Sequence, residues 1–342
     1  MRDAGIGRHD VQAVYCGSAY GARDQSVHRA PRSHGARRRC NRMPALRRHG
    51  SAMKAAPFTY HDPRTLGEAL ERLHSLEGAS LLAGGQSLVT LMNFRIAAPA
   101  HLIDLNRVDE LAYIRDEGAV IRVGAMTRQR ELEFSPLIAA RLPVVQEALG
   151  HVGYRQTRNR GTLGGSLCHL DPSAELVGVC ALLDAVLHLR SASGARDVPI
   201  AAWGQGLMTN ALAPGEMLVA VTITPWQGPH GHGFVEFARR HGDFAIVAVG
   251  AMLRLRPDGA IAGAALCLSG VAPVPVRAAA AERLLIGQRP GHAAWRAAAA
   301  EAARIEAMQD QHVSQAYRQH LARILSYRAL ELAAARALPQ MR

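Results

Sequence analysis

The sequence predicts an α+β protein, because short strands and helices mingle along it without the regular strand–helix alternation of a doubly wound sheet. The chain has 342 residues, of which 49% are hydrophobic. That is enough apolar surface to bury a large core and to form two domains. A stretch rich in glycine, proline and histidine, Pro225–Gly233, has the composition of a linker. We therefore expect a larger α+β domain followed by a small sheet with helices packed on it.

The elements of the first half follow from local patterns. Thr65-Leu66-Gly67-Glu68 has the form of a capping box, and it begins a helix that extends to about Leu76. Short apolar or alternating runs predict strands at Leu81–Ala83, His101–Leu105, Val120–Val123, Ala185–Leu189 and Met217–Thr224. Apolar spacing predicts helices at Arg128–Phe134, Val144–Leu149 and Ala174–Leu183.

The second half contains two apolar runs and two helical stretches. Phe244–Arg256 and Ala260–Ser269 flank the turn sequence Pro257-Asp258-Gly259, which indicates a pair of strands. Ala293–Ala307 and Val313–Ala335 have the apolar spacing of helices. No internal repeat is visible.

The net charge of +12 is concentrated at one end of the chain. Residues 1–52 carry 11 arginines, no lysine and three aspartates, so the remainder is only mildly basic. This segment lacks the apolar region of a signal peptide. We expect either a disordered basic tail or residues upstream of a natural start at Met53. Its only aromatic residues are Tyr15 and Tyr20, too few for the stacking expected of a nucleic-acid-binding arm, so we expect no nucleic-acid partner.

Several classes of protein are excluded by what the sequence lacks. No run of 18 apolar residues occurs, so we expect no membrane span. The five cysteines form no C-x-x-C pair, which argues against a disulfide framework or an iron–sulfur cluster and favours a reducing cytoplasm. The 16 histidines show no metal-ligand spacing, and no nucleophile elbow is present. We therefore expect no catalytic residue and no metal ligand in this chain.

Two glycine-rich segments are the strongest motifs, Ala83-Gly84-Gly85-Gln86-Ser87 and Thr162-Leu163-Gly164-Gly165-Ser166. Paired glycines permit positive φ and remove the Cβ atoms that keep a ligand away from backbone N–H groups. Successive exposed N–H groups bind anions, so two such turns would suit a diphosphate held from both sides. Neither segment reads G-x-G-x-x-G or G-x-x-x-x-G-K-[ST], which excludes the common dinucleotide and mononucleotide motifs.

The glycine segments also carry a family resemblance. Leu82–Leu88 with Leu91-Met92-Asn93, and Arg158–Ser166, resemble the two FAD motifs of the flavoprotein (medium) subunit of molybdenum hydroxylases, the xanthine dehydrogenase and aerobic carbon monoxide dehydrogenase group. The resemblance runs from about residue 58 to about residue 335 and includes Pro214–Leu218 and Gly242-Asp243-Phe244. It implies a two-subdomain FAD-binding domain of the vanillyl-alcohol-oxidase (PCMH) type over residues 53–228. A small α+β C-terminal domain would then occupy residues 229–342.

The resemblance implies specific roles. Ala83, Gly84, Gly85, Gln86 and Ser87 together with Thr162, Leu163, Gly164, Gly165 and Ser166 would hold the FAD diphosphate. Glu175 would lie near the ribose and adenine, and Leu218 would touch the flavin. The Arg239–Phe244 loop would lie beside the isoalloxazine. Several relatives carry a lysine seven residues before the aspartate of the Gly-Asp pair, where this chain has Glu236; Arg239 or Arg240 are the candidates to replace it.

The implied function is that of an FAD-carrying electron-transfer subunit. Electrons would arrive from [2Fe–2S] centres in a small partner subunit, fed by a large subunit with the molybdenum cofactor, in a dimer of heterotrimers. They would leave to NAD⁺, a quinone or oxygen. A stand-alone flavoenzyme of the same fold is the alternative, and the sequence names neither the substrate nor the acceptor.

Overall fold

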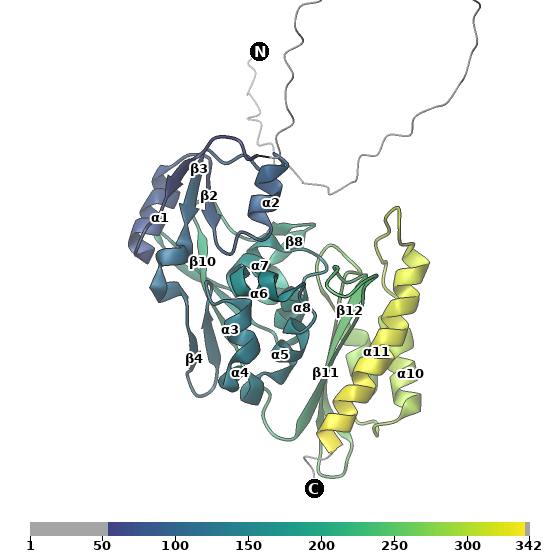
Figure 1. The fold of residues 1–342 in the computed structure, drawn as a ribbon. Coiled ribbons are helices and arrows are strands. Elements are labelled where there is room, and N and C mark those ends of the chain that lie inside the picture. Colours follow the sequence, from purple (N-terminus) through teal and green to yellow (C-terminus); the bar gives the residue numbers. More distant parts are fainter. Residues whose placement is uncertain (1–53, 339–342) are drawn as a thin grey trace, which may run out of the picture.

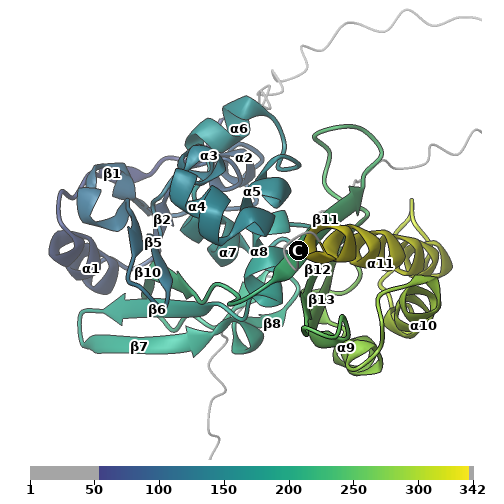
Figure 2. The ribbon, with the colours of Figure 1, turned by 90° about the horizontal axis from the view of Figure 1, so that it is seen from below.

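The computed structural model describes residues 54–338, and the predicted basic tail lies outside this range. The described chain forms three sheet-based units arranged side by side (Figures 1 and 2). They confirm the predicted α+β class. None of the described helices is long and apolar enough to cross a membrane.

The first unit is a three-stranded parallel sheet of order β1-β3-β2. Its strands are β1 (Thr59–His61), β3 (His101–Asp104) and β2 (Ala79–Leu82). Helix α1 (Leu66–Ser75) packs beside it, and β2 leads into the short helix α2 (Leu88–Asn93). Only half of the predicted capping box forms: Thr65 Oγ1 accepts from Glu68 N at 3.2 Å, whereas the Glu68 carboxylate accepts from Arg64 N.

The second unit is a five-stranded antiparallel sheet covered by helices. The order of its strands is β4 (Ile114–Asp116), β5 (Ile121–Gly124), β10 (Met217–Ile223), β6 (Val186–Ser191) and β7 (Gly194–Pro199). The helices are α3 (Gln129–Phe134), α4 (Pro136–Arg141), α5 (Pro143–Leu149), α6 (Arg155–Arg160), α7 (Leu163–His169) and α8 (Glu175–Leu182). A small ribbon, β8 (Gly204–Gly206) with β9 (Thr209–Asn210), follows the sheet's hairpin.

The third unit is an antiparallel sheet of order β11-β12-β13-β14. Its strands are β11 (His230–Phe237), β12 (Val247–Leu255), β13 (Ile261–Ser269) and β14 (Val276–Arg277). Along β12, Val247 and Val249 face α9 (Ala279–Leu285), α10 (His292–Ala302) and α11 (Gln315–Ala337). Ala248 and Met252 face the other way, into the core around α8. This alternation confirms the predicted sheet with helices packed on it.

Two expectations differ from the structure, one in its boundary and one in the type of element. The predicted linker ends inside β11, because its glycines serve helix packing: a Cβ on Gly231 would lie 1.9 Å from Ala333 O, and one on Gly233 would lie 2.5 Å from Ala329 O. Only glycine lets α11 approach the strand so closely. The second glycine segment is not a free turn but the start of α7, with Thr162 as its N-cap.

Candidate functional site

The two glycine segments meet at a cavity of about 500 Å³. Its walls come from the β2–α2 connection, from α7 and the start of α8, from β10, and from the residues just before β12. Eleven of the twelve site residues predicted from the sequence line it: Ala83, Gly84, Gly85, Gln86, Ser87, Thr162, Gly164, Gly165, Ser166, Glu175 and Leu218. Leu163 does not line the cavity; its buried side chain belongs to the hydrophobic core behind the wall.

The first glycine segment lines this cavity, and the backbone N–H groups of its last four residues have no partner in the described chain. It connects the end of β2 to α2, and Gly85 has a φ of +74°, in the left-handed region that favours glycine. Among residues 54–338, no acceptor is within hydrogen-bond reach of the N–H groups of residues 84 to 87. Four consecutive N–H groups without a partner in the protein are suited to binding an anion.

The second segment differs because its backbone donors are already used. The N–H groups of Leu163 and Gly164 donate to Thr127 O at 3.1 Å and Ala125 O at 2.8 Å. The N–H group of Gly165 donates to Thr162 Oγ1, and that of Ser166 donates to Thr162 O. The second segment therefore offers side-chain hydroxyls and a Cβ-free surface to the cavity, not the set of free amides expected from the sequence.

The first segment is in direct backbone contact with Arg160 and Gly161, which lead into the second segment. A Cβ added to Gly84 would lie 2.3 Å from Arg160 O and 2.9 Å from Gly161 Cα. A Cβ on Gly165 would lie 3.4 Å from the Cβ of Ala83. The glycines thus allow the two main chains to touch, which closes this end of the cavity.

A chain of polar contacts, which we call the strut, ties the segments together. The strut consists of Asp104, Asn106 and Arg128. Asn106 Nδ2 donates to Ala83 O at 3.0 Å, at the start of the first segment, and also to Asp104 Oδ1. Arg128 donates through Nη2 to Asn106 Oδ1 and through Nη1 to Arg160 O, the carbonyl that faces Gly84. One guanidinium therefore fixes the spacing of both glycine segments.

Glu175 lies in the first turn of α8, with only 6% of its surface exposed. Burial raises the pKa of its carboxyl to about 7. Its own backbone N–H and the nearby His151 oppose this rise, while Glu236 and Asp171 add to it. A carboxyl held in this way gains from a ligand that donates hydrogen bonds to it.

We expect the ligand-free Glu175→Gln variant to be more stable than the wild type at pH 8 but not near pH 5. Between pH 4.5 and about 7 the folded carboxyl is protonated while the unfolded one is ionised, so wild-type stability falls as the pH rises through this window. The shift corresponds to roughly 3 kcal/mol. Urea unfolding of both proteins at the two pH values measures this difference. A gap of the same size at both values would contradict it.

Glu236, at the position where several relatives carry a lysine, lies away from the cavity wall. Glu236 does not line the cavity: its side chain is 7% exposed and faces His151, with Nδ1 and Oε1 3.4 Å apart. This contact raises the pKa of His151. Neither Arg239 nor Arg240 lines the cavity, and both are exposed. Within the described chain, no arginine of this loop takes the place of a lysine at the cavity wall.

Phe244 is the part of the Arg239–Phe244 loop that reaches the cavity, with 65% of its surface exposed. The loop contacts Tyr154, whose hydroxyl donates to His241 O at 3.0 Å. A Cβ on Gly242 would lie 2.7 Å from the ring of Tyr154. The tyrosine thus supports the loop at the cavity mouth.

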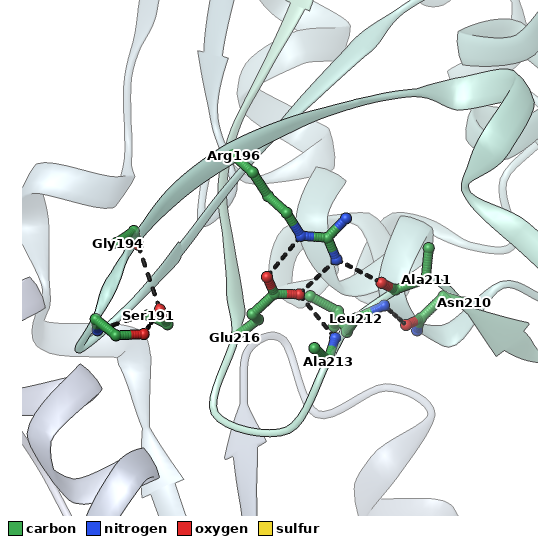
Figure 3. Close-up of polar contacts among 9 residues, drawn as sticks. Ser191, Gly194, Arg196, Asn210, Ala211, Leu212, Ala213 and Glu216 are labelled. Carbon is green, nitrogen blue, oxygen red and sulfur yellow. Dashed lines mark hydrogen bonds and ion pairs between the residues drawn. The ribbon is translucent and has the colours of Figure 1, made fainter.

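Leu218 reaches the cavity from β10 together with Met217. Figure 3 shows how the preceding loop is held: Arg196 donates through Nε and Nη2 to the two carboxylate oxygens of Glu216, each at 2.6 Å. Arg196 Nη2 also donates to Ala211 O at 2.7 Å. The hydrogen bonds from Arg196 to the Glu216 carboxylate hold the pKa of Glu216 below its ordinary value. The glutamate of the Pro214–Leu218 motif therefore anchors the loop that carries Leu218 to the site.

Sequence reasoning missed several residues that complete the cavity. They come from separate elements: Ala125, Met126, Gln129, Thr157, Asn210 and Leu212. Asn210 Nδ2 donates to Cys168 O at 2.7 Å, which joins the β8–β9 ribbon to the end of α7. No local pattern marks these residues, because each is brought to the site by the packing of its own element.

Family profiles match almost all of the described chain. Residues 56–226 match the family described as the FAD binding domain in molybdopterin dehydrogenase, and residues 232–333 match the CO dehydrogenase flavoprotein C-terminal domain.

Individual relatives match over similar lengths. The chain is 37% identical to the 6-hydroxypseudooxynicotine dehydrogenase complex subunit alpha of Paenarthrobacter nicotinovorans, over 84% of this chain and 98% of that protein. It is 35% identical to the carbon monoxide dehydrogenase medium chain of Afipia carboxidovorans, over 82% of this chain and 98% of the relative. A solved carbon monoxide dehydrogenase from Hydrogenophaga pseudoflava, lacking the Mo-pyranopterin moiety of its cofactor, superimposes with a TM-score of 0.80 at 35% identity. That match covers 83% of this chain and 99% of the solved one.

Proposed function

The chain belongs to the FAD-binding medium subunits of the molybdenum hydroxylases, and from this membership we propose that it passes electrons from the [2Fe–2S] centres of a partner to an external acceptor. It is an oxidoreductase subunit whose cofactor is FAD. The observation that carries the proposal is the cavity of about 500 Å³ lined by residues 84 to 87, whose four backbone N–H groups have no acceptor in the described chain. Bound FAD supplies reversible storage of two electrons, and the protein supplies binding and orientation.

The residues at the site fit FAD. The free N–H groups of Gly84, Gly85, Gln86 and Ser87 would hold the diphosphate, because a concave row of donors matches phosphate oxygens. Across the cavity, Thr162 and Ser166 contribute hydroxyl-bearing side chains and Gly164 and Gly165 a surface without Cβ atoms.

The two ends of the cofactor would be held by different walls of the cavity. Glu175 would accept hydrogen bonds from the ribose hydroxyls, which relieves the cost of its burial. Leu218 and Phe244 would bound the flavin end, and the exposure of Phe244 leaves that end open to a partner or an acceptor.

We propose that the working form is a complex with a large molybdenum-cofactor subunit and a small [2Fe–2S] subunit, assembled as a dimer of heterotrimers. Relatives that are named as medium chains or as subunits of complexes support an assembly with other subunits. Residues 53–228 would form the FAD-binding domain and residues 229–342 the C-terminal domain. The three described cysteines are free thiols, which suits a reducing compartment, and we propose the cytoplasm.

The test is an anaerobic titration of the isolated, flavin-loaded subunit with candidate substrates, with loss of the blue flavin absorption band as the readout. We expect no rapid reduction, because residues 54–338 contain no group of metal ligands that could hold a second redox centre to take electrons from a substrate. Co-expression with the molybdenum and iron–sulfur partners is expected to give rapid bleaching by the substrate of the complex. Rapid and specific reduction of the isolated subunit by an organic substrate would instead establish the stand-alone flavoenzyme.

A further inference from the structure

Gln129 is a buried polar side chain that the protein itself leaves unsatisfied. It is the first residue of α3, only 6% exposed, and it lines the cavity. Its Oε1 is fully buried without a hydrogen-bond partner, and among the described residues its Nε2 has none either. Native proteins rarely leave a buried polar atom unpaired, and of the four such residues in the described chain only Gln129 lines the cavity.

The position of Gln129 relates it to the two glycine segments. Its backbone N–H donates to Gly161 O at 2.8 Å, which fixes α3 against the second segment. The carboxamide lies on Gly161, where an added Cβ would be 2.5 Å from Oε1. The free polar group therefore lies beside the place where the main chain of the second segment touches the first.

The chemistry of a carboxamide narrows what it can bind. It offers a donor and an acceptor together, whereas phosphate oxygens at neutral pH only accept hydrogen bonds. A hydroxyl can donate to Oε1 or accept from Nε2, and because Oε1 is buried against Gly161, a bond to it requires the carboxamide to turn toward the cavity. In FAD, sugar hydroxyls flank the diphosphate on both sides, in the ribityl chain and in the adenosine ribose.

We propose that Gln129 is a binding residue that hydrogen-bonds a sugar hydroxyl of FAD next to the diphosphate. The inference rests on the proposed FAD site and adds a contact that the glycine motifs do not contain. The proposal also predicts how loss of this side chain changes the stability of the ligand-free protein. Since the carboxamide has no partner in the ligand-free protein, replacing it with an apolar side chain removes a buried unpaired group and leaves that form no less stable.

The test compares Gln129→Leu with the wild type, using the full chain stripped of flavin. We expect FAD affinity, followed by quenching of flavin fluorescence, to fall by about 10- to 50-fold. The melting temperature of the ligand-free variant is expected to equal or exceed that of the wild type. If the leucine variant does not fold, Gln129→Met preserves the length of the side chain and serves the same purpose.

Gln146→Leu is the matched control. Gln146 Nε2 donates to Glu133 O at 2.6 Å, and the residue does not line the cavity. Its loss is expected to lower the melting temperature and leave FAD affinity unchanged. The two glutamines should therefore show opposite patterns.

Binding of ADP to Gln129→Leu identifies the hydroxyl. A loss of ADP affinity equal to the loss for FAD places the contact on the ribose, and unchanged ADP affinity places it on the ribityl chain; either result supports the proposal. Wild-type affinity for FAD in the variant overturns it, as does a melting temperature that falls like that of Gln146→Leu. A wild-type protein that binds no FAD at all overturns the proposed function itself.

Discussion

Replacing Gly84 by valine is expected to abolish FAD retention, with a loss of affinity of more than about 100-fold. The Cβ alone would lie 2.3 Å from Arg160 O, well inside van der Waals contact, and the obstructing atoms are backbone. The two glycine segments must then separate, which misplaces the row of free N–H groups. We also expect a stability loss of roughly 2–3 kcal/mol, because neither main chain can yield cheaply. Flavin content per protein and thermal unfolding of the purified variant measure both effects.

Gly194→Val is the control for this experiment. Gly194 begins β7 in an exposed hairpin, and nothing lies within 4 Å of its added Cβ. The same side chain there is expected to leave flavin content and stability unchanged. Full flavin occupancy in Gly84→Val would show that the contact between the segments does not shape the site.

Replacing Arg128 by methionine is expected to weaken FAD binding by about 10- to 100-fold. The variant loses the hydrogen bonds from Arg128 to Asn106 Oδ1 and to Arg160 O, so the strut no longer joins the segments. Charge-assisted hydrogen bonds of this kind contribute about 1.5–3 kcal/mol each, and part of this is lost from binding because the site must be re-formed around the ligand. Isothermal calorimetry at a temperature far below unfolding measures the binding loss separately from any loss of stability.

Arg130→Met is the matched control, in the same helix. The Arg130 guanidinium lies over the Phe134 ring, 4.4 Å from its centroid, and does not reach the glycine segments. This change is expected to leave FAD affinity within about twofold of the wild type. If Arg128→Met lowers the melting temperature but leaves FAD affinity unchanged, the strut stabilises the fold and does not contribute to FAD binding.

Much of the fold follows from local patterns in the sequence. The Thr65 cap, the Pro257-Asp258-Gly259 turn and the apolar runs around it depend on neighbours a few residues away, so they predict α1, β12 and β13 well. The helix expected at Ala293–Ala307 ends earlier, at Ala302, which is the last of its four buried residues, Trp295, Ala298, Ala299 and Ala302. Short elements such as β1, β14 and α6 have too few residues to show a period, and the sequence did not predict them.

Family membership and the two FAD motifs were also determined by the sequence alone, because the motifs are contiguous and their order is fixed along the chain. What each glycine does was decided only by the tertiary structure. Gly84 is needed for contact with Arg160, Gly164 for contact with Ala125, and Gly231 for the approach of α11. Paired glycines look alike in a sequence whether they face a ligand or a neighbouring main chain.

The strut and Gln129 likewise depend on contacts between distant segments. Asn106, Arg128 and Arg160 are 22 and 32 positions apart, and none lies in a recognisable motif with its partner. Whether a backbone N–H is free to bind phosphate depends on whether another segment has already supplied an acceptor. Ala125 and Thr127 do so for the second glycine segment, and no described residue does so for the first. The sequence by itself determined where the glycines lie; only the folded chain decided which of their N–H groups remain for a ligand, because that depends on long-range pairing.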